Sequence, residues 1–237
     1  MSTSSLTYIA EQFKGKFIAE PEILREKLLK IKAFVFDWDG VFNNGEKNEN
    51  ATSLFNEVDA MGTNLLRFNH FQRTGRVPIT AIISGENNSA AFSLAKREHF
   101  QAVYYGIKYK ALALQHICMT LQVKPDEVAF IFDDVLDFSM AEKCGLRIMV
   151  NRVCNPLLLD FAVENNMVDY ITYADGSKHA VRESSELLLG LSGIYKQTLA
   201  ARMNFTDEYL LYLQTRNQAP TVCYTTQASS IVEKQPS

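Results

Sequence analysis

The sequence contains few cysteines, and their arrangement fits neither a disulfide framework nor a zinc site. They form no C-x-x-C pair and have no histidine at a zinc-ligand spacing; the four are Cys118, Cys144, Cys154 and Cys223. No stretch approaches the roughly 18 apolar residues of a membrane span. The first residues also lack a basic segment followed by an apolar run, so no signal peptide is indicated. We therefore expect reduced thiols in a cytoplasmic protein that is neither exported nor inserted in a membrane.

The chain also lacks an excess of charge of either sign. Its 24 Lys and Arg residues oppose 27 Asp and Glu residues, which gives a net charge of -3 over 237 residues. Because no block of basic residues could follow a phosphate backbone, nucleic-acid binding is not expected. Hydrophobic residues make up 47% and charged residues 22% of the chain, which is typical of a globular protein with a full core. A disordered or fibrous protein is therefore excluded.

Internal repeats, and a linker that would separate two domains, are likewise missing from the sequence. We expect one domain over residues 1–237, with a core at about 30–195, an N-terminal helix within 1–30 and a helical C-terminal extension at about 196–237. Short apolar runs alternate with amphipathic segments, which is the pattern of a parallel sheet buried on both faces. The expected strands are Ala33–Phe36, Ile79–Ile83, Ala102–Tyr105, Val128–Phe132, Arg147–Val150 and Tyr170–Tyr173. The expected helices cover about 21–31, 60–73, 87–99, 110–122, 136–144 and 156–165.

Some segments depart from this alternation. Phe42–Val58 is rich in Asn and Gly turn signals and stands where a strand would lead into its helix, which predicts a projecting β-hairpin. Ala180–Met203 predicts one long helix, and Thr206–Gln214 predicts a shorter one. The polar, Pro-containing end, Gln227–Ser237, is expected to be frayed.

Two of the apolar strands end in acidic residues. Asp37 and Asp39 end the first strand, and side chains at i and i+2 of an extended segment point the same way, so we expect these two to converge. Asp133, Asp134 and Asp137 follow the strand that ends at residue 132, and the carboxyl ends of parallel strands open onto one crevice. Carboxylates this close repel one another unless a hard cation lies between them, and Mg²⁺ suits an all-oxygen site that also holds a phosphate. Taken without the second cluster, Asp37 and Asp39 could instead be solvated loop acids.

Two further residues complete a candidate phosphate site. Ser84 and Gly85 follow the strand Ile79–Ile83, which places a hydroxyl and free backbone N–H groups at the same edge of the sheet. Lys110 follows Gly106 at the start of a helix, where its ammonium group can reach an anion in the crevice. Taken alone, Ser84 could equally be a turn residue that bonds its own backbone.

These motifs stand in a fixed order: D-x-D-G-V at Asp37, then Ser84, then Lys110, then D-D-x-x-D at Asp133. In that order they resemble the haloacid dehalogenase (HAD) superfamily. Over about 30–195 the sequence is similar to its capless branch of 3-deoxy-manno-octulosonate 8-phosphate phosphatases and nonulosonate 9-phosphate phosphatases. The resemblance implies a Rossmann-like α/β fold, with a central parallel sheet, helices on both faces, a small β-hairpin flap and no large cap domain. It also implies a homotetramer whose hairpins help to enclose neighbouring sites.

The resemblance assigns roles in catalysis to four residues. Asp37 would be the nucleophile that forms an aspartyl-phosphate. Asp39 would be the acid/base that protonates the leaving alcohol and then activates water. Ser84 and Lys110 would neutralise phosphoryl oxygens in the transition state. The implied function is a phosphatase acting on a small phosphorylated metabolite, in particular a sugar or sugar-acid phosphate.

The resemblance also implies a metal site. Mg²⁺ would be held by Asp133, the Asp37 carboxylate and the backbone carbonyl of Asp39. Asp134 and Asp137 would position the metal ligands and the lysine rather than bind the metal.

Two departures from the family pattern concern the substrate. Glu86 stands where these sugar-acid phosphatases commonly have Arg, and only Gly176 remains of a stretch, 176–179, that usually carries three glycines. Two alternative functions stay open from the residues. A receiver domain also combines clustered acids, a hydroxyl and a Lys, but it would carry its phosphate acceptor alone on a later strand. The other alternative is a non-catalytic, oligomeric binding module of HAD fold, which the two departures support.

Overall fold

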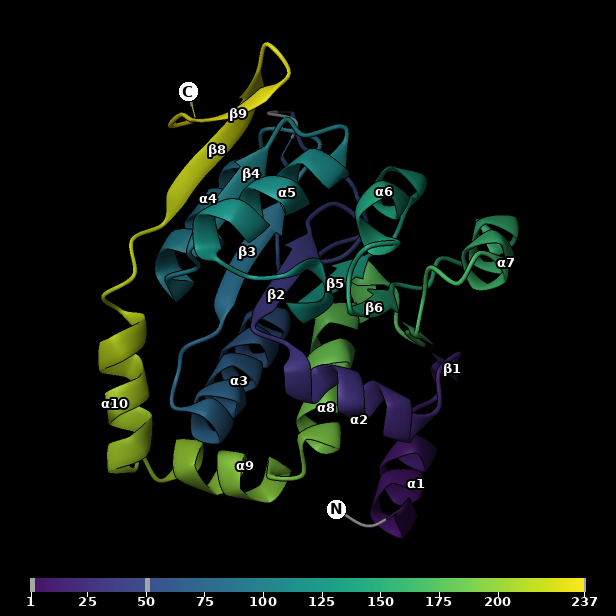
Figure 1. The fold of residues 1–237 in the computed structure, drawn as a ribbon, viewed down its shortest axis with the longest axis vertical. Coiled ribbons are helices and arrows are strands. Elements are labelled where there is room, and N and C mark those ends of the chain that lie inside the picture. Colours follow the sequence, from purple (N-terminus) through teal and green to yellow (C-terminus); the bar gives the residue numbers. More distant parts are fainter. Residues whose placement is uncertain (1–2, 50–51, 237) are drawn as a thin grey trace.

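The computed structural model describes residues 3–49 and 52–236, and within them one sheet forms the centre of the fold (Figure 1). Its strand order is β1-β7-β6-β5-β2-β3-β4-β8-β9. The strands from β7 across to β8 are parallel, while β1 and β9 pair antiparallel at the two outer edges. The strands are β1 (Lys16–Phe17), β2 (Ala33–Asp37), β3 (Ile79–Ile83), β4 (Ala102–Tyr105), β5 (Val128–Phe132), β6 (Leu146–Met149), β7 (Tyr170–Ile171), β8 (Val222–Gln227) and β9 (Ser230–Glu233).

Helices connect these strands and cover both faces of the sheet. They are α1 (Thr3–Gln12), α2 (Pro21–Lys30), α3 (Glu57–Thr74), α4 (Ser89–Glu98), α5 (Lys110–Leu121), α6 (Phe138–Ala141), α7 (Pro156–Glu164), α8 (Ala180–Ser192), α9 (Tyr195–Met203) and α10 (Asp207–Arg216). Successive side chains of a strand point to opposite faces. Phe34 and Phe36 of β2 therefore pack with α2, α3, α4 and α8, whereas Ala33 and Val35 pack with α5, α6 and α7. The predicted α/β class with a central parallel sheet is confirmed.

The predicted β-hairpin at Phe42–Val58 is wrong for the described residues of that segment. Residues 42–49 and 52–56 contain no strand, and α3 begins at Glu57. Side chains satisfy the loop backbone locally: Oδ1 of Asn43 accepts from Gly45 N at 2.8 Å, and Oδ1 of Asn44 accepts from Glu46 N at 3.0 Å. Such Asx turns compete with cross-strand pairing, so the turn-rich composition produces a loop rather than a hairpin.

The predicted single helix Ala180–Met203 is also wrong, because Gly193 divides it into α8 and α9. Gly193 has a φ of 92°, in the left-handed region that ends helices, and its N–H bonds the carbonyl of Gly190. The next helix, α10, confirms the short helix predicted near Thr206–Gln214. In Figure 1, α9 and α10 lie at the lower margin, at the opposite end from the strands β8 and β9.

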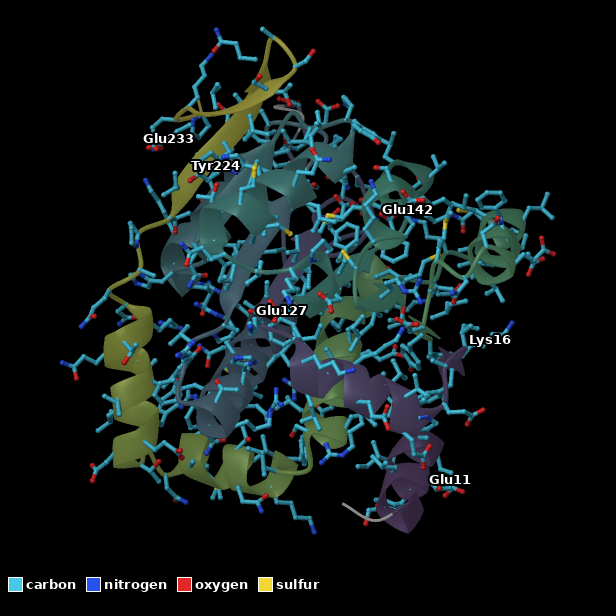
Figure 2. All side chains as sticks on the ribbon, viewed as in Figure 1. Glu11, Lys16, Glu127, Glu142, Tyr224 and Glu233 are labelled. Carbon is cyan, nitrogen blue, oxygen red and sulfur yellow. The ribbon has the colours of Figure 1, made fainter. Side chains whose placement is uncertain are left out.

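The C-terminal end is not frayed as the sequence predicted, because β8 and β9 extend the sheet beyond β4. Tyr224 of β8 lies opposite Tyr104 of β4, and their rings stack at 5.1 Å between centroids. Tyr224 also pairs with Glu233 of β9, and both residues are labelled in Figure 2. The strands β8 and β9 contain β-branched residues, but polar residues surround them in the sequence. Composition alone therefore indicates disorder there.

The N-terminal segment 1–30 is not one helix, because α1 and α2 are separated by the short strand β1. Leu6 of α1 is buried, and α1 packs against α2 and α8. None of the helices in the described ranges combines the length and the apolar character that a bilayer crossing requires.

Candidate active site

The acidic clusters meet at the carboxyl edge of the sheet, around a cavity of about 290 Å³. Its lining comes from the segments that follow β2, β3, β4, β5 and β6, as expected for a crevice in an open parallel sheet. Asp37, Asp39, Lys110 and Asp133 all line this cavity. The structure therefore brings together residues that are up to 96 positions apart in the sequence.

Three buried carboxylates form the centre of the site. One oxygen from each of Asp37, Asp133 and Asp137 lies within 4.8 Å of the others, and the three residues are only 6%, 1% and 1% exposed. Lys110 contributes a cation to this group: its Nζ lies 2.5 Å from Oδ1 of Asp37 and also contacts Asp137. This contact with Asp137 agrees with the role that the sequence analysis gave it, which is to position the lysine.

Burial and the neighbouring charges change the pKa of both Asp37 and Lys110. Burial, reinforced by the charge of Asp137, raises the pKa of Asp37 to about 7, although the Lys110 ammonium acts in the opposite direction. Burial alone would lower the pKa of Lys110, but the charges of Asp37 and Asp137 outweigh it and raise that pKa. Lys110 is therefore a permanent cation next to a carboxylate that titrates near neutrality.

Asp133 has the environment of a carboxylate that holds a cation. Neither of its side-chain oxygens accepts a hydrogen bond from the described residues, although both are buried. Burial, followed by the charges of Asp37 and Asp137, raises the pKa of Asp133 to about 9. The one ion pair in the described chain that opposes this shift joins Asp133 to Arg152, at 2.5 Å between Oδ2 and Nε. The buried Oδ1 of Asp133, which has no hydrogen-bond donor among the described residues, fits a hard divalent cation such as Mg²⁺.

Arg152 is a residue of the site that the sequence motifs did not indicate. A usable signal was present, because Arg152 stands three residues after β6 ends, and the segment after a parallel strand emerges at the same edge as the acids.

The Asp39 carboxylate lies outside the group of three and has its own partners. Its Oδ1 contacts Ser53 Oγ and Lys47 Nζ, and its Oδ2 accepts a hydrogen bond of 3.0 Å from Asn88 Nδ2. Ser53 Oγ in turn accepts from Trp38 Nε1 at 3.1 Å. Asp37 and Asp39 thus line the same cavity, as expected, but each side chain has its own set of contacts. No periodicity or motif in the sequence indicates Ser53 or Asn88 as site residues.

Ser84 is buried beside the cavity rather than in its lining. Its hydroxyl accepts from Glu86 N at 3.1 Å and from Asn88 Nδ2 at 3.4 Å, while the neighbouring Gly85 lines the cavity. Glu86 is paired with Lys108, with 2.5 Å between Oε1 and Nζ. The anion that replaces the family's usual Arg is therefore neutralised locally.

Gly40 allows the chain to turn away directly after the acid pair. Its φ is 87°, and a Cβ built there would lie 2.1 Å from Oδ2 of Asp133 and 1.8 Å from Nη2 of Arg152. Any side chain at this position would displace the groups around Asp133. The glycine of the D-x-D-G-V motif is thus required by both backbone conformation and space.

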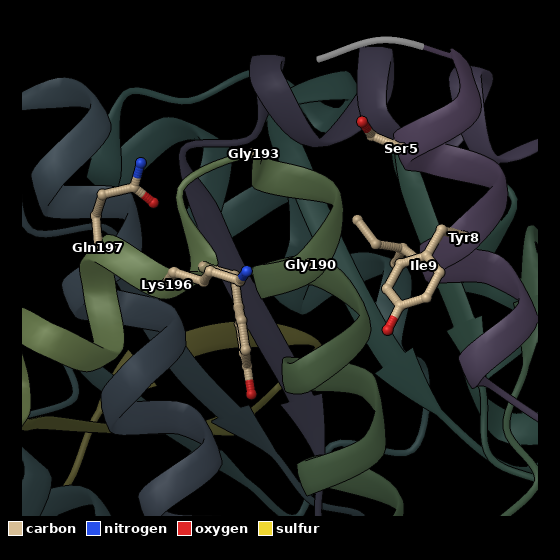
Figure 3. Close-up of a pocket in the computed structure, with 8 residues that line it drawn as sticks. Ser5, Tyr8, Ile9, Gly190, Gly193, Lys196 and Gln197 are labelled. Atoms are coloured by element: carbon tan, nitrogen blue, oxygen red, sulfur yellow. The ribbon is translucent and has the colours of Figure 1, made fainter.

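A larger hollow of about 580 Å³ lies on another part of the molecule, between α1 and the junction of α8 and α9 (Figure 3). Tyr8, Ile9 and Gly190 are among the described residues that line it, and none of those residues is acidic. This hollow is larger than the acidic cavity, but its described lining has no carboxylate that could act as a nucleophile or hold a metal. We therefore assign the candidate active site to the smaller, acidic cavity.

Comparisons with known proteins find chains similar to this one. No family model matches the chain. The 3-deoxy-D-manno-octulosonate 8-phosphate phosphatase of Salmonella typhi is 28% identical over 171 residues, which are 70% of this chain and 84% of that protein. The enzyme of the same name from Yersinia pestis is 29% identical over 168 residues, covering 69% and 82% of the two chains.

Solved structures give the same result. The 3-deoxy-D-manno-octulosonate 8-phosphate phosphatase of Moraxella catarrhalis, in complex with magnesium ion, phosphate ion and KDO, has a TM-score of 0.63 and 27% identity, covering 75% of this chain and 97% of that one. The corresponding Yersinia pestis structure has a TM-score of 0.62 and 26% identity, covering 74% and 89%.

The fold, the order of the site residues and these similarities support the resemblance of the chain to the haloacid dehalogenase superfamily. Within the superfamily the similarity is to the capless branch, here the 3-deoxy-D-manno-octulosonate 8-phosphate phosphatases.

Proposed function

We propose that this protein is a Mg²⁺-dependent phosphatase that hydrolyses a phosphomonoester of a small metabolite, a sugar or sugar-acid phosphate. The observation that carries the proposal is the buried group of Asp37, Asp133 and Lys110 at the carboxyl edge of the sheet. Relatives that share the fold are named as phosphatases of a sugar-acid phosphate, which supports this substrate class. The non-catalytic alternative is not favoured, because each residue type that the chemistry needs is present at the cavity.

In the proposed reaction Asp37 attacks phosphorus. A bond forms between its carboxylate oxygen and phosphorus while the bond from phosphorus to the leaving alcohol breaks, and Asp39 gives its proton to that alcohol. The Asp39 carboxylate then takes a proton from water as the water oxygen bonds phosphorus and the bond between phosphorus and the Asp37 oxygen breaks, which releases phosphate and restores the Asp37 carboxylate. Asn88 and Ser53 hold the Asp39 carboxylate at the cavity during both steps.

Charge on the phosphoryl oxygens is balanced by groups already in the site. Lys110 supplies a fixed cation, and the Ser84 hydroxyl with the following backbone N–H groups supplies donors. Asp133, the Asp37 carboxylate and the backbone carbonyl of Asp39 would hold Mg²⁺. When bound, that ion adds positive charge that polarises the phosphoryl group.

The proposal is tested by assaying a generic aryl phosphate and a panel of sugar phosphates with Mg²⁺. We expect hydrolysis by the parent and none by Asp37→Asn, because the amide keeps the shape of the side chain and is not a nucleophile. Circular dichroism of the variant serves as the control for folding. Equal rates for parent and variant would exclude the aspartyl-phosphate mechanism, and no hydrolysis by the parent would exclude the function.

We also propose that the protein forms a homotetramer. Leu54 in the loop before α3 is 70% exposed, and Val58 and Met61 at the start of α3 are 41% and 40% exposed. Exposed apolar side chains near one another in the sequence favour an interface between subunits. Light scattering is expected to give about four times the chain mass of 26.8 kDa. A fully active monomer would rule out this assembly.

We further propose a cytoplasmic location. All four cysteines are free thiols, and Cys144 and Cys223 are buried in the core, an arrangement that suits a reducing compartment. Fractionation of cells that express the protein tests this location.

A further inference from the structure

Arg152 occupies an unusual position for an arginine, in contact with a proposed metal ligand. It lies in the segment after β6, and its Nε is 2.5 Å from Oδ2 of Asp133. The side chain of Asp133 is 1% exposed, whereas that of Arg152 is 26% exposed and lines the cavity. The guanidinium therefore reaches the buried carboxylate from the mouth of the site.

The other cations that line the cavity are held differently. Lys110 is 3% exposed and is bound by two carboxylates, so it cannot leave without stranding both. Lys108 is paired with Glu86, which is not a proposed metal ligand. Among the lining cations of the described chain, Arg152 alone combines solvent access with a single carboxylate partner that a metal would also use.

The guanidinium also lies close to the proposed metal ligands on β2. Its Nη2 is 1.8 Å from the point where a Cβ of Gly40 would lie, directly after the Asp39 carbonyl. A monovalent and a divalent cation this close, beside buried carboxylates, repel each other. Contact of Asp133 with Mg²⁺ and with the Arg152 guanidinium at the same time therefore has an electrostatic cost.

If the Arg152 side chain moves away from Asp133, its positive charge stays at the mouth of the cavity. The same Nη2 atom is 3.6 Å from the Cβ position of Gly45, a residue of the loop that borders the cavity. An arginine at such a rim presents a planar pair of donors that matches a carboxylate or phosphate.

We propose that Arg152 and the metal ion compete for Asp133, and that the displaced guanidinium binds an anionic group on the substrate other than its reacting phosphate. The second half of this inference rests on the proposed phosphatase function, whereas the first half does not. Arg152 would thus be a specificity residue for acidic sugar phosphates, and it would supply the positive charge that Glu86 does not.

The first experiment measures Mg²⁺ binding by calorimetry, without any substrate. Arg152→Met keeps an unbranched apolar stem and removes the guanidinium charge, so Mg²⁺ should bind about threefold more tightly or better, the scale of a partly exposed ion pair. Lys108→Met is the matched control, because it removes one positive charge from the same cavity without touching Asp133. We expect its Mg²⁺ affinity to stay within about twofold of the parent's.

The second experiment compares two substrates at saturating Mg²⁺, 6-phosphogluconate and sorbitol 6-phosphate. They have similar length and differ in a terminal carboxylate. Arg152→Met should raise KM about tenfold for 6-phosphogluconate, the scale of one charge-assisted hydrogen bond, and about twofold at most for sorbitol 6-phosphate.

The outcomes separate the parts of the proposal. Unchanged or weaker Mg²⁺ binding in Arg152→Met would mean that the arginine supports Asp133 as a ligand, and competition would be excluded. Equal changes in KM for both substrates would exclude recognition of the anion. If the parent hydrolysed neither substrate, the proposed substrate class and the recognition role would fail together, while the calorimetric comparison would still decide the competition.

Discussion

Lys110 Nζ lies 2.5 Å from Oδ1 of Asp37 and contacts Asp137 on its other side, so one buried cation joins the start of α5 to two separate carboxylates. All three side chains are less than a tenth exposed. The bridge therefore fixes the end of β2 relative to the segment that follows β5. A single residue contributes both to the charge of the site and to the stability of the fold.

Replacement of Lys110 by Met should consequently affect stability as well as activity. It leaves Asp37 and Asp137 buried without their cation, which typically costs about 3–5 kcal/mol. Urea unfolding measures this loss. Lys108→Met is the control, because Lys108 is 64% exposed and its pair with Glu86 should contribute about 1 kcal/mol at most. Equal unfolding midpoints for Lys110→Met and the parent would contradict the importance of the bridge.

The sequence predicted the parts of the site that belong to strand ends. Asp37, Lys110 and Asp133 each follow an apolar run, and parallel strands deliver such residues to one edge, so periodicity and order along the chain suffice. The same reasoning predicted the first and last residues of the central strands to within a residue or two. A strand that is buried on both faces is apolar along its whole length, so its ends are visible in the sequence.

The residues that sequence reasoning missed are those placed by tertiary contacts. Ser53 lies in an irregular loop, and only the loop's packing against Trp38 and Asn88 brings its hydroxyl to Asp39. The strand β8 was missed for a related reason: it forms because β4 offers an open edge, not because its own sequence is strongly apolar. Side-chain hydrogen bonds in the loop at 42–49 likewise outcompeted the hairpin that its composition suggested.

Asp133 should make stability depend on pH in a defined direction. Burial raises its pKa to about 9, far above that of a solvent-exposed aspartate, so between those two values the folded state keeps a proton that the unfolded state loses. Stability therefore falls as pH rises through this window. Asp133→Asn cannot ionise and should escape this loss.

Thermal unfolding in EDTA at pH 5 and pH 8 measures the difference. The melting temperature of the parent should fall by at least about 2–4 °C more than that of Asp133→Asn, the size of a difference of about 1 kcal/mol in a chain of this length. Groups that titrate alike in both proteins cancel in the comparison. Added Mg²⁺ should then raise the melting temperature of the parent more than that of the variant. Parallel pH profiles in EDTA would mean that Asp133 is not protonated in the fold.

Asp39→Asn tests the proposed acid/base directly. The amide can still accept the hydrogen bond from Asn88, but it cannot exchange a proton with the leaving alcohol or with water. The chemical step should slow by about 10²–10⁴-fold, the usual contribution of a positioned acid/base. Single-turnover kinetics with an aryl phosphate measure this step.

A good leaving group such as nitrophenolate needs less protonation, so the loss of rate in Asp39→Asn should be smaller for an aryl phosphate than for a sugar phosphate. The same loss for both would argue against a role in protonating the alcohol.

Asn88→Ala tests how much of that contribution depends on orientation. Asn88 donates 3.0 Å to Oδ2 of Asp39 and accepts 3.0 Å from the Ser53 backbone N–H, so it holds both the acid and the loop that contacts it. The substitution keeps the Asp39 carboxylate but removes a hydrogen bond that fixes its orientation. We therefore expect kcat to fall about 10–100-fold, as for other groups that orient an active carboxylate. Mg²⁺ affinity should stay close to that of the parent, because Asp37 and Asp133 are untouched. Asn204→Ala is the control, since Asn204 is exposed at the end of α9 and bonds only its own helix. If Asn88→Ala kept the parental kcat, the Ser53 contact and the backbone alone would be sufficient to orient Asp39.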